Sequence, residues 1–336
     1  MTVETSRVLR PSTLVPVLLL AGLALLPWVA TAAGQPFWIA FFARTVIYAI
    51  AASALNIALG YGGLVGFGHA LFLGLGCYAV ALPSFFGSGN GWIHLLWCVG
   101  ATGVAALVTG AISLRTSGIA FIMITLAFGQ MGYFLLVSLK NFGGDDGLPI
   151  SLTSRFGPLD LGSPLAVYCT SFAVLAMATW WSARLRAAPF GMTLRGAQQN
   201  ARRVSAIGLP ALRYQLAAYV ISGVLCGVAG LLLANLNAFA SPSTMSWTVS
   251  GELIVMVVLG GMGSVFGPLL GAVAFLGLEE ALKGVTEHVW VVFGPLIVLV
   301  ALVGKGGIAG LLQRLDRIGP AARTAPVVAA AEEAVS

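Results

Sequence analysis

Charged residues are scarce in this chain of 336 residues: Asp, Glu, Lys and Arg together make up 8%, and hydrophobic residues make up 59%. A water-soluble domain of this length could not cover its surface with so few charges. Between Pro11 and Leu139 the only charged residues are Arg44 and Arg115. Since a membrane-spanning helix needs about 20 apolar residues, this part of the chain predicts several spans and an integral membrane protein.

The chain also lacks the short motifs that mark common enzyme classes. It contains no phosphate-binding G-x-x-x-x-G-K-[ST], no H-E-x-x-H and no G-x-S-x-G. The histidines His69, His94 and His288 lack metal-ligand spacing, and the cysteines lie in apolar stretches without C-x-x-C spacing. We therefore expect a protein that is not an enzyme and holds no metal or other cofactor.

Ionisable side chains are nearly absent from the predicted spans. A transporter driven by protons or sodium usually keeps Asp, Glu or His inside its helix bundle. Glu252, at the start of an apolar segment, is the best exception. Uphill transport by this chain would therefore draw its energy from another subunit. An ion-coupled secondary transporter and a purely structural membrane scaffold remain alternatives.

Apolar segments of spanning length recur along the chain. They cover residues 14–33, 37–59, 64–86, 92–113, 118–139, 164–182, 212–235, 251–283 and 289–304. The segment 251–283 is rich in glycine, which predicts close packing and a broken or re-entrant helix rather than one straight span. We expect an all-α, polytopic integral membrane protein with about 8–10 transmembrane helices.

The basic residues predict the orientation, because cytoplasmic loops carry an excess of Lys and Arg. With the N-terminus in the cytoplasm, most of the 17 basic residues face that side, whereas Asp145, Asp146 and Asp160 lie outside. The first apolar segment, which ends near Ala30, also has the pattern of a signal peptide. We favour a retained helix, because no soluble exported domain follows it.

A basic loop interrupts the apolar sequence at residues 184–213, which contain six arginines. Apolar residues recur there at helical spacing as far as Ile207, and Gly208 followed by Pro210 predicts the end of a short amphipathic helix. Such a helix suits docking into a cleft of a cytoplasmic motor protein. The alternative is a helix lying on the anionic lipid surface, with arginines that serve topology only.

Several glycine-rich stretches follow one another in a specific order. They are Leu55–Gly63, Gly68–Tyr78, Thr125–Met131, Gly143–Leu148, and Val257–Ser264 with the pair Gly267-Pro268. Together they resemble the Liv-type permeases, which are the membrane subunits of ABC importers for branched-chain amino acids, and the long loop at 143–148 resembles the M-type subunit. Leu64 and Gly66 stand where the family commonly has Gln and Ser, and Gln198 and Ala201 where Arg and Glu are frequent.

This resemblance implies a bacterial inner-membrane permease with both termini in the cytoplasm. Residues 1–13 and 306–336 would be cytoplasmic tails, and 14–305 the transmembrane permease domain with 184–213 as its coupling loop. The implied partners are a second related permease subunit, two cytoplasmic ATP-binding subunits and a periplasmic solute-binding protein, within a lipid bilayer and without nucleic acid. The implied cargo is a branched-chain or related hydrophobic amino acid; urea, short amides or other small solutes are the alternative.

Three sets of residues are predicted to carry this function. The ATPase-coupling set lies in the basic loop and comprises Arg195, Arg202, Arg203, Ile207 and Gly208. The substrate-path candidates have polar or aromatic side chains in apolar surroundings and are Asn56, Tyr61, His69, Thr125 and Gln130. The helix break is assigned to Gly260, Gly261, Gly263 and Gly267. For the buried polar groups, a hydrogen bond to a neighbouring helix is the alternative to lining a path.

Overall fold

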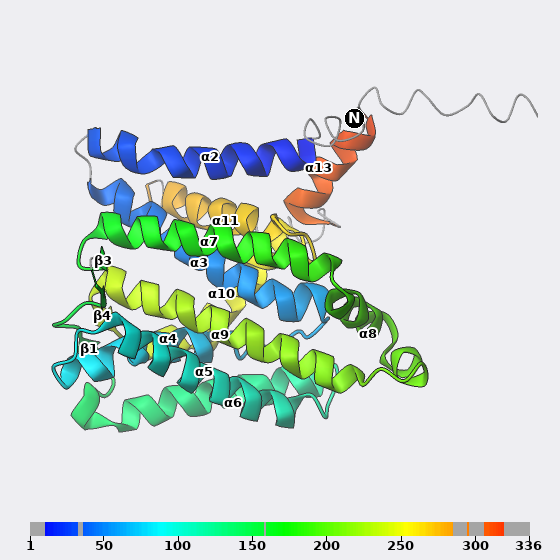
Figure 1. Ribbon diagram of the computed structural model, residues 1–336, viewed down its shortest axis with the longest axis horizontal. Helices are drawn as coiled ribbons and strands as arrows, with labels where there is room; N and C mark the ends of the chain where they lie inside the picture. Colours follow the sequence, from blue (N-terminus) through cyan, green and yellow to red (C-terminus); the bar gives the residue numbers. More distant parts are fainter. Residues whose placement is uncertain (1–10, 33–35, 158, 285–293, 296–305, 319–336) are drawn as a thin grey trace, which may run out of the picture.

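The computed structural model describes residues 11–32, 36–157, 159–284, 294–295 and 306–318, and within them the chain is a bundle of long helices (Figure 1). The helices are α2 (Pro11–Ala32), α3 (Pro36–Asn56), the π-helix η1 (Ile57–Tyr61), α4 (His69–Phe85), α5 (Gly91–Ser113), α6 (Ile119–Ser138), η2 (Lys140–Phe142), α7 (Pro164–Ala187), α8 (Pro189–Ala206), α9 (Ala211–Asn237), η3 (Pro242–Met245), α10 (Trp247–Gly260), α11 (Gly267–Lys283) and α13 (Gly307–Ile318).

Five stretches of the described residues are long and apolar enough to cross a membrane. They are Phe37–Tyr61, Gly91–Ser113, Ile119–Ser138, Pro164–Ala187 and Ala211–Asn237, and shorter apolar helices lie at Leu14–Pro27, His69–Phe85 and Trp247–Gly260. These helices confirm the all-α, polytopic membrane fold. The predicted segment 289–304, apart from 294–295, lies outside the described residues, as do most of the two predicted tails.

The bundle has two distinct ends (Figure 1). One, which we call the α8 end, carries α8, α13 and the beginning of α2. The opposite end, which we call the strand end, carries two short antiparallel strand pairs. They are β1 (Leu148–Pro149) with β4 (Phe239–Ala240), and β2 (Arg155–Phe156) with β3 (Leu159–Asp160). The beginning of α2 and helix α13, which are the first and last helices that the structure describes, therefore lie at the same end of the bundle as α8.

The centre of the bundle is built from α3, α4 and α9. About 72% of the spanning window of α3 is buried and 61% of that of α9, against 28% for α5 and 22% for α6. Central helices need small residues to approach one another closely. Gly76 of α4 faces Gly227 and Gly230 of α9 so closely that a Cβ on Gly76 or Gly230 would overlap a backbone carbonyl of the other helix.

The predicted break in 251–283 is confirmed. Helix α10 ends at Gly260, α11 starts at Gly267, and residues 261–266 connect them in a tight turn. Gly261 and Gly263 adopt φ values of +113° and +73°, which L side chains rarely adopt. A Cβ on Gly260 would overlap the carbonyl oxygen of Gly267, so the glycines allow both the turn and the close contact between the two helices.

A buried polar network anchors the loop at the strand end. His94 Nε2 donates to the carbonyl of Ser88 at 3.0 Å, so its Nδ1 accepts from the Ser154 hydroxyl at 2.7 Å. Asn235 of α9 completes the network, since its Nδ2 donates to Ser154 Oγ and its Oδ1 accepts from the backbone N–H of Ser154. The network joins α5, the 150–163 loop and α9.

Replacing Ser154 with alanine is expected to loosen this loop. The change leaves His94 Nδ1 and one Asn235 N–H without their partner, at a cost of about 1–3 kcal/mol for buried groups. The expected results are a lower melting temperature of the detergent-purified protein and faster proteolysis of the loop. Thr153→Ala, at an exposed neighbouring hydroxyl, is the control, and equal effects of both changes would contradict the role of the network.

Candidate coupling and translocation site

Helix α8 forms the basic loop and consists of two helical pieces. It starts at Pro189, a favourable residue for the first turn. At Asn200 the backbone leaves the helical region (φ −158°, ψ 95°), and the Asn200 side chain accepts a hydrogen bond from the N–H of Arg203 at 3.1 Å. Asn200 thus acts as the N-cap of a second short helix, which sets Arg202 and Arg203 apart from the first piece.

Gly208 ends this second piece with a hydrogen-bond pattern typical of glycine. Its φ is +86°, its N–H donates to the carbonyl of Ser205, and the N–H of Leu209 donates to the carbonyl of Val204. This is a Schellman motif, and Leu209 packs against the apolar cluster that contains Val204. The predicted helix stop at Gly208 agrees with this geometry.

The predicted coupling residues divide into two groups. Arg202, Arg203 and Ile207 are exposed at the tip of α8, and Ile207 retains 73% of its accessible surface. Arg195 points back to the bundle, where its Nη2 donates to the carbonyl of Arg186 at 3.0 Å and its Nε to that of Gly191 at 3.4 Å. The guanidinium of Arg195 thus holds α8 against the end of α7.

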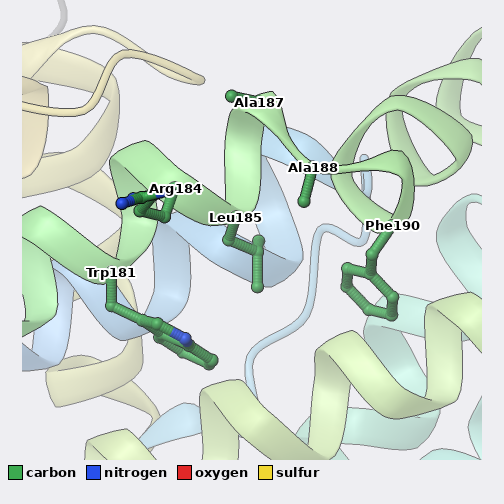
Figure 2. Close-up of a pocket in the computed structure, with 6 residues that line it drawn as sticks. All are labelled: Trp181, Arg184, Leu185, Ala187, Ala188 and Phe190. Atoms are coloured by element: carbon green, nitrogen blue, oxygen red, sulfur yellow. The ribbon is translucent and has the colours of Figure 1, made fainter.

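A groove of about 400 Å³ lies where α7 meets α8, as Figure 2 shows. Trp181 and Leu185 reach into it from α7 and Phe190 from α8, while the side chain of Arg184 extends away from the gap between Leu185 and Phe190. Arg184 instead lies 5.7 Å from the ring centroid of Trp180. The groove is therefore an apolar surface with a basic rim next to the coupling helix.

A second cleft, of about 520 Å³, separates α8 from the rest of the α8 end. Its walls are the turn at 62–65, the α5–α6 connection at 114–118, the first turn of α6, the start of α9, and the α8 residues Ala197, Gln198 and Ala201. The side chain of Gln198 crosses towards Gly63, whose Cβ, if present, would lie 2.7 Å from Gln198 Cγ. The turn after η1 therefore contacts α8 directly. Glycine suits this position, because the φ of Gly63 is +67° and a side chain would collide with Gln198.

Two path candidates lie at the ends of the π-helix η1: Asn56 directly precedes it and Tyr61 is its last residue. Asn56 is fully engaged: its Nδ2 donates to the carbonyl of Ser264 and its Oδ1 accepts from the N–H of Gly263, both at 2.9 Å. Tyr61 is buried among Ile57, Leu185 and Leu194. Neither residue borders either of the clefts described above.

His69 begins α4 and is completely buried. Its Nε2 lies 2.8 Å from Ser222 Oγ, and because that hydroxyl donates to the carbonyl of Ala54, His69 must donate through Nε2. Its ring also contacts the rings of Phe72 and Tyr219 edge-on. The imidazole therefore joins the three central helices α3, α4 and α9.

Thr125 and Gln130, the remaining path candidates, lie on α6. Thr125 is buried, and its hydroxyl accepts from the N–H of Phe67 at 3.1 Å and donates to the carbonyl of Phe121 at 3.0 Å, which fixes the non-helical segment 62–68 against α6. Gln130 is half-buried. Asn56, Tyr61 and His69 thus lie in or next to the segment 57–69, Thr125 contacts that segment through Phe67, and Gln130 lies farther along α6.

Sequence reasoning missed several polar residues in this region. Ser222 carries the His69 contact, and Ser250 Oγ accepts from the backbone N–H of Ala70 at 3.0 Å. Gln198 appeared only as a departure from the family pattern, although it contacts Gly63. A hydroxyl inside an otherwise apolar segment was the available signal, because such a group needs a partner when buried.

Comparisons with known proteins identify the family. Residues 37–303 match the family described as "Branched-chain amino acid transport system / permease component". The chain therefore belongs to this family of transport permeases, which are not enzymes.

The chain is 26% identical over 268 residues to the high-affinity branched-chain amino acid transport system permease protein LivM of Salmonella typhimurium, and equally to that of Escherichia coli K12. Each alignment covers 73% of this chain and 63% of the relative, so the chain spans less than two thirds of the length of these relatives. A probable LivM of Methanocaldococcus jannaschii is 25% identical over 68% of this chain and 76% of the relative.

Proposed function

We propose that the chain is the M-type permease subunit of an ABC importer for branched-chain or related hydrophobic amino acids in the bacterial inner membrane. A second related permease subunit, two cytoplasmic ATP-binding subunits and a periplasmic solute-binding protein complete the importer. In this assembly the α8 end and both termini face the cytoplasm. ATP is hydrolysed by the partner subunits, and this chain performs no covalent chemistry.

The observation that carries the proposal is the family match over 37–303, and the geometry of α8 supports it. A helix with exposed Arg202, Arg203 and Ile207, capped by Gly208, projects from one end of the bundle (Figure 1). The neighbouring groove adds an apolar surface with a basic rim. These features suit docking onto a cytoplasmic protein with acidic and apolar contact residues.

A second candidate keeps the same transport class but changes the cargo to urea, a short amide or another small solute. It is favoured by Leu64 and Gly66, which replace the usual polar residues of the family in the segment after η1. Other relatives also carry names with different cargoes, such as the L-arabinose ABC transporter permease protein AraH of Azospirillum brasilense, 25% identical over 54% of each chain.

The test is transport by the complete importer. The chain is purified together with a second permease subunit, two ATP-binding subunits and a solute-binding protein from the same organism and reconstituted in vesicles of bacterial lipid. We expect uptake of labelled leucine that requires ATP and the binding protein. Uptake of urea or L-arabinose instead would support the second candidate, whereas uptake that persists without ATP and collapses with an uncoupler would indicate an ion-coupled transporter.

A further inference from the structure

Asn56 bridges two breaks in the helical bundle that are far apart in sequence. It is the last residue of α3, directly before the π-helix η1. Its side-chain amide reaches the α10–α11 turn, where it donates one hydrogen bond to the carbonyl of Ser264 and accepts one from the N–H of Gly263. A neighbouring β-strand would form the same two kinds of hydrogen bond through its backbone. Both bonds are made to backbone atoms, so the position of the turn depends on the Asn56 side chain and not on the identity of its partners.

The backbone around this bridge is shaped to admit it. A Cβ on Gly60 would overlap Oδ1 of Asn56 and lie 2.6 Å from the N–H nitrogen of Gly263. Gly263 in turn approaches the carbonyl of Gly60, and its φ of +73° aims its N–H at Asn56. Only glycine at both positions lets the two turns come this close. The two breaks therefore form one tightly packed unit.

The same unit contacts the coupling helix. Gly63, three residues after Gly60, packs against the side chain of Gln198 on α8. On the other side of the unit, Gly261 packs against Gly307 and Ala309 at the start of α13. A continuous set of contacts thus runs from α8, through the turn at 57–63 and Asn56, to the α10–α11 turn.

We propose that Asn56 is a positioning residue that transmits the movement of α8 to the α10–α11 hairpin during transport. A movement of α8 displaces the turn at Gly63, and the Asn56 amide carries that displacement to residues 263–264. Its role is mechanical, and it makes no contact with the cargo. The inference rests on the proposed function, since it needs an ATPase that moves α8.

The test is Asn56→Leu, which keeps the approximate size of the side chain and removes both hydrogen bonds. The matched control is Ser53→Ala, on the same helix: Ser53 is buried, and its hydroxyl has no hydrogen-bond partner within the described part of the chain. The complete importer is reconstituted with each variant, and the cargo transported per ATP hydrolysed is measured per folded complex. We expect this ratio to fall about tenfold for Asn56→Leu, because a tenfold change corresponds to about 1.4 kcal/mol, which is the size of free energy lost when buried backbone groups lose their hydrogen-bond partner. For Ser53→Ala we expect the ratio to stay at the wild-type value.

The kinetic constants separate this role from its alternatives. A transmitting residue lowers the maximal rate and the transport-to-ATP ratio without changing the half-saturating concentration of loaded binding protein or the order of preference among cargoes. A changed preference among leucine, valine and urea would overturn the proposal in favour of a path-lining residue. Reduced melting temperature with a normal ratio per folded complex would overturn it in favour of a structural role.

A second pair of variants tests the link to α8. Gln198→Ala removes the side chain that packs on Gly63, whereas Gln198→Leu keeps an apolar stem of similar length. We expect the ratio to fall with alanine and to be largely retained with leucine, because Gln198 is exposed and acts through packing. Equal transport-to-ATP ratios for the two variants would contradict the proposal that Gln198 passes the movement of α8 to Gly63. If the wild-type importer shows no ATP-dependent uptake, the proposed function fails instead.

Discussion

Replacing Gly230 with valine is expected to prevent accumulation of the folded protein. A Cβ at this position would overlap the carbonyl oxygen of Leu73 on α4 and lie 3.1 Å from Cα of Gly76. Backbone atoms cannot move aside as a flexible side chain can, so α4 and α9 must separate in the centre of the bundle. We expect a cost of about 3 kcal/mol, near the top of the range for overpacked interiors, and a loss of most folded protein from the membrane fraction.

The matched control is Gly100→Val. Gly100 lies on the exposed face of α5, and a Cβ there would meet no heavy atom within 4 Å. Both variants add the same β-branched side chain to a helix, so propensity effects are shared. The amount of monodisperse protein after detergent extraction and its melting temperature are compared, and a Gly230 variant as abundant and stable as the Gly100 variant would refute the close α4–α9 contact.

Gly208→Asp is expected to lower ATP-dependent uptake at least about tenfold, a difference of about 1.4 kcal/mol in coupling, while membrane insertion remains intact. The carboxylate would sit at the C-terminal end of α8, where the helix dipole disfavours negative charge, a few residues after the exposed Arg202 and Arg203. It would therefore change the charge of the surface that we propose to meet the ATPase. No heavy atom lies within 4 Å of a Cβ at this position, so the side chain meets no neighbour, and the strain that remains comes from the φ of +86°.

Gly208→Asn separates charge from backbone strain. Asparagine has nearly the same shape as aspartate, and both tolerate the left-handed conformation that the φ of +86° requires. We expect uptake within about twofold of the wild type for this variant, since the motif at the end of α8 can still form. Normal uptake by the aspartate variant would remove Gly208 from the coupling surface, and equal losses in both variants would assign its role to backbone conformation alone.

The membrane fold and much of the candidate site were predictable because they depend on local sequence. The apolar segments of 37–59, 92–113, 118–139 and 212–235 became α3, α5, α6 and α9 with small shifts at their ends. The expected segment 64–86 starts later, at His69, because residues 62–68 form a turn fixed by Thr125. Apolar content alone could not show that turn, since Leu64, Val65 and Phe67 are apolar and the remaining residues of 62–68 are glycines without charge.

The assignment of single side chains was less predictable. Arg195 was expected to meet an ATPase with Arg202 and Arg203, yet its guanidinium is bonded to the carbonyls of Arg186 and Gly191. Its contact with an ATPase stays a prediction. Helical spacing places these arginines on one short helix, but the kink at Asn200 decides which of them face away from the bundle.

By itself, the sequence determined that this chain is a helical membrane protein, that its glycine-rich segment near residue 260 is broken, and that α8 stops shortly before Gly208. These properties follow from apolar content and from backbone angles that few residues except glycine adopt, both of which are local. Only the tertiary structure decided what Asn56 binds, because its partner Ser264 is 208 positions away. An amide in an apolar segment predicts that hydrogen-bond partners are needed, but which residues supply them depends on how distant helices pack.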